Sequence, residues 1–105
     1  MTEQPNEAAQ TEDFEFAALR LAENYRRALV EEFAVELRGR VLEVGAGIGQ
    51  MTSLLRELPA IDLLQCVEPS PDFCAGFSRE HPTIPLVQGT VHRKRSLTIW
   101  RIRGP

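Results

Sequence analysis

Two carboxylates and a glycine-rich segment have the residue types and the spacing of a small-molecule site. Residues 40–52 read RVLEVGAGIGQMT, in which an acid is followed by three alternating glycines: Glu43, Gly45, Gly47 and Gly49. A glycine turn between a strand and a helix lets a ligand approach the backbone, and free N–H groups there attract an anion. Glu68 ends the next apolar run, and in a parallel sheet it would face the same crevice as the glycine loop.

The residues of this segment argue against a dinucleotide loop and exclude a P-loop. A dinucleotide fingerprint is G-x-G-x-x-G, whereas the third glycine here comes one residue early, and the Glu43 carboxylate would repel a pyrophosphate. A P-loop requires a Lys-Ser/Thr pair after the last glycine, and Gln50-Met51 stands there. An amino acid moiety fits better, with its amine at Glu43 and its carboxylate at the loop amides. A ribose diol suits Glu68, so methionine joined to adenosine satisfies both carboxylates.

Three segments then resemble the first three motifs of class I S-adenosylmethionine-dependent methyltransferases. They are VLEVGAGIGQMT, CVEPSPDF and PLVQGTV, and NYRRALVEEFAVEL resembles the helix that precedes the first strand in many bacterial members. The resemblance covers about residues 20–91 and implies S-adenosyl-L-methionine as the cofactor. It implies nothing about the methyl acceptor.

The resemblance also implies a role for individual residues. The cofactor loop would consist of Gly45, Ala46, Gly47 and Gly49, with Glu43 at the methionine end and Glu68 at the ribose hydroxyls. Pro69 and Ser70 would flank the adenine, and its other side would be bordered by Gln88, Gly89 and Thr90. Many members carry an acid near the position of Thr90, whose hydroxyl is a weaker acceptor for the adenine amino group. Neither a catalytic base nor a metal site is identified in the sequence.

The elements that position these residues alternate between helix and strand. Apolar residues at steps of three and four predict a helix over about 13–38, capped by Gly39. Strands are predicted at 41–44, 62–68 and 84–89, and helices at about 50–58 and about 70–81. This order predicts an α/β fold: a partial Rossmann-like methyltransferase fold, with an N-terminal helix, three mainly parallel strands and flanking helices.

We expect three regions along the chain of 105 residues. Residues 1–12 are acidic and polar and are predicted to be disordered. Residues 13–91 would form the S-adenosylmethionine-binding half of a methyltransferase domain. Residues 92–105 form a basic tail of uncertain structure, in which 96–102 either returns as an antiparallel strand or is disordered.

The number of predicted strands falls short of the family. A class I domain has seven strands, so the resemblance predicts a chain truncated after the third strand, or a natural short variant. The acceptor site would be missing, which makes catalysis by this chain alone doubtful. The strand at 41–44 would then have an open edge that invites self-association or a partner. A non-catalytic binding or interaction module is therefore the alternative function.

Plainer interpretations of the other features stay open beside this one. The glycines alone would make a tight turn, and Glu68 would cap the following helix or lie on the surface. Cys66 and Cys74 lack metal or redox spacing and are expected to be buried free thiols. His81, before Pro82, is expected at the surface of a helix end rather than as a catalytic base, and the same expectation covers His92.

Charge and hydropathy limit the partners and the location. The net charge is −3, and all 15 acidic residues precede the basic cluster at Arg93, Lys94, Arg95, Arg101 and Arg103. Because Trp100 is the single aromatic residue among these basic residues, the cluster indicates a solvated tail rather than a nucleic-acid site. The sequence has no apolar run of membrane-spanning length and no secretory signal at its start. We therefore expect a cytoplasmic protein.

Overall fold

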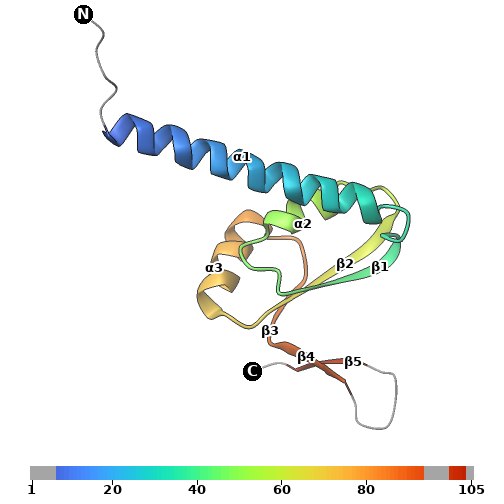
Figure 1. Cartoon of the computed structure of the whole chain (residues 1–105). Helices are drawn as coiled ribbons and strands as arrows, with labels where there is room; N and C mark the ends of the chain where they lie inside the picture. The colour runs from blue at the N-terminus through green and yellow to red at the C-terminus, as the bar shows by residue number, and fades with distance from the viewer. Residues whose placement is uncertain (1–6, 94–99, 104–105) are drawn as a thin grey trace, which may run out of the picture. The chain divides into compact units, whose positions relative to one another are not determined.

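The computed structural model describes residues 7–93 and 100–103, and the side chains of residues 13–92. Figure 1 shows the elements in chain order: α1 (Glu7–Phe33), β1 (Gly39–Val44), α2 (Gln50–Leu55), β2 (Ile61–Glu68), α3 (Pro71–Glu80), β3 (Leu86–Gln88), β4 (Thr90–Arg93) and β5 (Trp100–Arg103). By its internal contacts the chain divides into two compact units, residues 1–32 and residues 33–105.

Helix α1 begins earlier than its apolar periodicity predicts. It starts at Glu7 rather than near Asp13, so residues 7–12 are helical and their predicted disorder is wrong. The segment EAAQTED is rich in strong helix formers, which extend the helix where no apolar face requires it. The prediction for residues 1–6 lies outside the described residues.

The C-terminal end of α1 also differs from the prediction. The helix ends at Phe33 rather than near Arg38, and the N–H of Leu37 donates to the Phe33 carbonyl at 3.1 Å in the turn that follows. Gly39 has a positive φ of 69°, but it begins β1 instead of capping the helix. No helix in the described part of the chain is both long and apolar enough to cross a membrane.

The central sheet is parallel and has the strand order β1-β2-β3 (Figure 1). Val44 of β1 pairs with Val67 of β2, and Glu68 of β2 pairs with Gln88 of β3. Parallel neighbours require crossover connections, which α2 and α3 supply after β1 and β2. The predicted α/β arrangement is thus confirmed, and β3 is shorter than the expected strand at 84–89.

Local sequence explains where α2 and α3 begin. Gly49 precedes α2 in a left-handed conformation, with φ 91° and ψ 27°. Ser70 precedes α3, and its side-chain oxygen accepts from the N–H of Phe73 at 3.3 Å. Pro71 and Asp72 then occupy the first turn, where a proline and an acid are both favourable. The observed starts of α2 at Gln50 and of α3 at Pro71 confirm the predicted starts.

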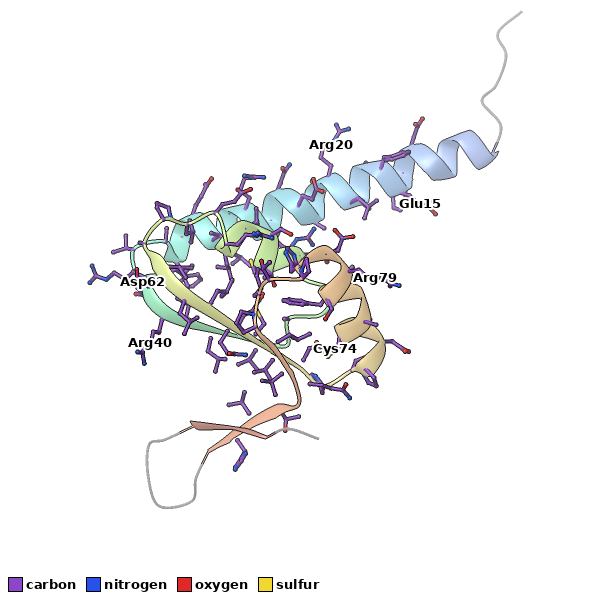
Figure 2. The ribbon with its side chains drawn as sticks, turned by 180° about the vertical axis from the view of Figure 1, so that it is seen from behind. Glu15, Arg20, Arg40, Asp62, Cys74 and Arg79 are labelled. Atoms are coloured by element: carbon purple, nitrogen blue, oxygen red, sulfur yellow. The ribbon has the colours of Figure 1, made fainter. Side chains whose placement is uncertain are left out.

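The core of the second unit is formed by buried residues of β2, α2 and α3. The fully buried large side chains are those of Phe77, Val67, Thr52 and Cys66. Cys74, labelled in Figure 2, projects from α3, and its Sγ lies 3.3 Å from the carbonyl oxygen of Glu68. Both cysteines are buried free thiols, as the sequence predicts.

The two thiols are expected to react slowly with a water-soluble disulfide reagent while the protein is folded. Burial, followed by the charge of Glu43, raises the pKa of the Cys66 thiol to about 11. Burial also raises the pKa of Cys74, and the charge of Glu68 adds to this effect. The thiolate is the nucleophile, and because the pKa of both thiols is raised, few molecules carry a thiolate at neutral pH. Absorbance of the released thiolate should rise slowly without urea and rapidly in urea; equal rates would contradict the prediction.

Strand β1 lies at one edge of the sheet. Among the described residues only β2 pairs with it, and the side chains of Leu42 and Val44 are 41% and 59% exposed. The expected buried strand therefore has one open face. Self-association through this edge stays a prediction, which light scattering across a concentration series would test.

Residues after β3 form a separate two-stranded sheet. β4 and β5 are antiparallel, with Thr90 opposite Arg103 and Arg93 opposite Trp100 (Figure 1). The chain thus returns as an antiparallel strand at 100–103, one of the two alternatives that the sequence left open. The strand pairs with β4 and not with β3. The rest of the basic tail, residues 94–99 and 104–105, lies outside the described residues.

Candidate functional site

The glycine loop between β1 and α2 has a backbone that only glycine adopts readily. Gly45, Gly47 and Gly49 have positive φ angles of 71°, 60° and 91°. Around Gly45 and Gly47 there is open space where a Cβ would stand, so conformation alone favours glycine there. At Gly49 a Cβ would also overlap the buried ring of His81. The three glycines therefore hold one specific turn rather than a flexible linker.

Hydrogen bonds tie the first half of this loop to β2. The N–H groups of Gly45 and Ala46 donate to the Val67 carbonyl at 2.8 and 3.1 Å. The N–H of Gly47 donates to Oε1 of Glu68 at 2.8 Å. These loop amides, which the sequence offers to a ligand carboxylate, already have partners within the protein. Their bonds place the loop directly over the carboxyl end of β2.

Glu68 is the central acceptor of the site. Its side chain is only 5% exposed, and its two oxygens accept from different segments. Oε1 accepts from Gly47 of the loop and Oε2 accepts from the N–H of Ser70 at 2.8 Å. Glu68 thus joins the glycine loop to the start of α3. The second bond matches the plainer interpretation, in which Glu68 serves the following helix, and the first bond goes beyond it.

Glu43 is held by a residue that sequence reasoning missed. Its two carboxylate oxygens lie 2.6 and 2.8 Å from Oγ1 of Thr52, which is fully buried in α2. Burial raises the pKa of Glu43, and the hydrogen bond from Thr52 partly offsets that rise. The expectation that a carboxylate at the end of this strand needs a partner is therefore met within the protein.

Glu43→Gln is expected to reduce the dependence of stability on pH in the mildly acidic range. The carboxyl ionises around its ordinary value of 4.5 in the unfolded chain, while burial raises its pKa in the native state. Between these two values the native state binds more protons, so wild-type stability falls as pH rises through this window. Urea denaturation of both proteins from about pH 4 to about pH 8 measures the difference. Parallel stability curves would show that Glu43 does not titrate in this way.

The residues expected around the adenine come from two chain segments that meet at Glu68. Pro69 follows it directly and is exposed. On the other side, the N–H of Gly89 donates to the Glu68 carbonyl at 3.0 Å, which brings the end of β3 beside the end of β2. Thr90 comes next, is exposed, and begins β4. The structure thus brings Glu68, Pro69 and Gly89 together, with Thr90 at the margin.

His81 is the clearest error of the sequence reading. It is 5% exposed instead of lying on the surface, because α3 ends with its imidazole turned onto the glycine loop. Its Nε2 lies 2.9 Å from the Gly49 carbonyl oxygen, and its ring packs 5.2 Å, centroid to centroid, from Phe77. The proline after it signals a helix end, but no local pattern reveals a contact with a residue so distant in the chain.

The assembled site offers two carboxylates, a tightly turned loop and exposed positions beside them. Among the residues that the structure describes, no group of three His, Cys, Asp or Glu side chains is arranged to hold a metal ion. The register of β1 with β2 puts Glu43 and Glu68 on neighbouring strands, at the ends that lead into the loop and into α3. Such an arrangement can bind a ligand that carries a positive group at one end and hydroxyl donors at the other.

Comparison with known proteins supports the fold and leaves the family open. No protein-family model matches the sequence, and no curated protein matches it. DhpI, solved in complex with SAH, is similar at 23% identity and a TM-score of 0.57, over 76% of this chain and 39% of DhpI. The PH0226 protein of Pyrococcus horikoshii OT3 is similar at 20% identity and a TM-score of 0.47, over 60% of this chain and 31% of its own. The chain spans about two-fifths of DhpI, and its fold is a partial Rossmann-like α/β fold.

Proposed function

We propose that this chain binds S-adenosylmethionine and its product S-adenosylhomocysteine, as the cofactor-binding part of a methyltransferase. The observation that carries the proposal is the Glu68 carboxylate, which holds the glycine loop through Gly47 and the start of α3 through Ser70. A similar fold in a protein solved with SAH supports it. The methyl acceptor is a separate matter, because binding of the cofactor does not depend on it.

Glu68 would bind the ribose while keeping its two backbone bonds. A carboxylate offers about four lone-pair directions, and the N–H groups of Gly47 and Ser70 use two of them. The remaining two can accept from the 2′- and 3′-hydroxyls of a ribose. The carboxylate is already held in position, so little side-chain entropy is lost when the ligand binds.

Glu43 would serve the amino acid end of the same ligand. Its carboxylate is fixed by Thr52, and burial disfavours its charge in the absence of a partner. A ligand ammonium group would supply the missing positive charge. The cofactor itself brings the electrophilic methyl group on a sulfonium. The residues of this chain would bind and orient it, with Pro69, Gly89 and Thr90 proposed beside the adenine.

Calorimetry with two ligands tests the two ends of the site separately. S-adenosylhomocysteine carries the amino acid group, whereas 5′-methylthioadenosine has a methyl group on the sulfur in place of the amino acid chain. Glu43→Gln should weaken the binding of S-adenosylhomocysteine by about tenfold or more and leave the binding of 5′-methylthioadenosine nearly unchanged. Glu68→Ala should weaken the binding of both ligands.

Exposed Glu57 provides the matched control, because Glu57→Gln removes a charge outside the site. It should bind both ligands as the wild type does. The proposal is contradicted if the wild-type protein gives no heat with S-adenosylhomocysteine. It is also contradicted if Glu68→Ala and Glu57→Gln bind equally well.

A further inference from the structure

His81 makes three polar contacts with one short stretch of chain. Its Nε2 lies 2.9 Å from the Gly49 carbonyl oxygen and 3.2 Å from Oγ of Ser53. Its Nδ1 lies 3.0 Å from Nη1 of Arg56. The partners stand at the last glycine of the loop, within α2 and just after it. A single buried side chain from the end of α3 therefore reaches both ends of α2.

The chemistry of these partners selects one tautomer of the imidazole. A carbonyl oxygen only accepts hydrogen bonds, so Nε2 must carry the hydrogen that faces Gly49. A guanidinium only donates, so Nδ1 must be unprotonated where it faces Arg56. Ser53 is consistent with this assignment, because its hydroxyl donates to the same Gly49 carbonyl at 3.0 Å. A neutral imidazole with hydrogen on Nε2 satisfies all of the contacts.

The contact with Gly49 matters because this residue joins the loop to α2. Its carbonyl also accepts from the N–H of Ser53 at 3.1 Å, which is the first turn of the helix. Its φ of 91° is left-handed, a conformation that a residue with a Cβ adopts only under strain, and the ring of His81 fills the space that a Cβ would take. The loop therefore ends against an imidazole that packs closely on Gly49 and contacts its carbonyl oxygen.

We propose that His81 is a positioning residue for the cofactor, whose Nε2–H holds the Gly49 carbonyl and thereby fixes the glycine loop in its binding conformation. The inference rests on the proposed function. It adds a residue from the distal end of α3, outside the three motifs that resemble a methyltransferase. The role needs a neutral donor at Nε2 and a neutral acceptor near Arg56, rather than a charge or a ring.

Two substitutions separate positioning from simple packing. In His81→Gln the amide N–H stands close to the position of Nε2, and its oxygen can accept from Arg56, so both contacts can be kept. In His81→Leu the volume is similar and both contacts are lost. S-adenosylhomocysteine should bind His81→Leu about tenfold more weakly than the wild type, and His81→Gln within about threefold of it. Equal binding by the wild type and His81→Leu would overturn the proposal.

Measurements on the ligand-free protein keep this inference separate from the proposed function. The chain has two histidines, so His92→Gln leaves one imidazole, whose ¹⁵N shifts should report hydrogen on Nε2 and none on Nδ1. Amide hydrogen exchange of Ser53 should accelerate in His81→Leu and not in His81→Gln. Exchange of Cys66, whose N–H donates to the Pro85 carbonyl at 2.9 Å, should stay unchanged in both.

Each outcome of these measurements is decisive for His81. Hydrogen on Nδ1, or unchanged exchange of Ser53 in His81→Leu, would overturn the positioning role whatever the ligand does. Equal acceleration at Ser53 and Cys66 would reduce the role to general stability and would overturn it too. The wild type could bind no S-adenosylhomocysteine while its ¹⁵N shifts and the exchange of Ser53 agree with the expected results. In that case the proposed function is contradicted, whereas the contact by which His81 fixes the glycine loop is supported.

Discussion

Glu68→Gln is expected to lower the free energy of unfolding by about 2 kcal/mol. It should also weaken the binding of S-adenosylhomocysteine more than tenfold, which corresponds to a loss of at least about 1.4 kcal/mol of binding free energy. Both carboxylate oxygens of Glu68 accept from backbone N–H groups, those of Gly47 and Ser70, at 2.8 Å each. A glutamine has only one oxygen, so its amide nitrogen must face one of these two donors. Two donors then face each other, so one hydrogen bond of this largely buried side chain is lost.

Urea denaturation and calorimetry measure the two effects of Glu68→Gln independently. Glu57→Gln is the matched control, since it makes the same chemical change at an exposed position. That variant should lie within about 0.5 kcal/mol of the wild type. If the two variants are equally stable, the bonds of Glu68 do not hold the loop as described.

Among the glycine-to-alanine substitutions in the glycine loop, Gly49→Ala is expected to lower the free energy of unfolding most. The residue has a φ of 91°, which an alanine adopts at a cost of about 1–2 kcal/mol. The new Cβ would overlap the His81 ring and would lie 3.1 Å from Cδ2 of Phe77, and such overpacking costs about 1–3 kcal/mol more. We therefore expect a loss of about 3 kcal/mol, a large part of the stability of a small domain.

Gly47→Ala isolates the contribution of packing from that of backbone conformation. Its φ of 60° is also left-handed, but a Cβ there would meet nothing within 4 Å. It should therefore lose only the conformational part, about 1–2 kcal/mol. Chemical denaturation of the two variants gives the difference directly. Equal losses would mean that the His81 ring moves aside at little cost.

Local patterns were sufficient to predict the elements around the site. The apolar run that stops at Gly45 and the capping sequence Ser70-Pro71-Asp72 each act within a few residues, so their consequences can be read from the chain. The beginnings of α2 and α3 and the parallel order β1-β2-β3 agree with those predictions. Helix α1 was placed less well, because intrinsic propensity carries it back to Glu7 and a turn after Phe33 ends it early.

By itself, the sequence determined that two acids flank a glycine turn at the carboxyl ends of neighbouring strands, because strand order and chain spacing put them there. Only the tertiary structure decided what those acids and that turn contact: Thr52 at Glu43, the loop amides at Glu68, and His81 at Gly49. The physical reason is that a hydrogen bond depends on distance and direction between atoms in space. His81 and Gly49 are 32 residues apart, and packing of α3 on the sheet is what brings them within 2.9 Å.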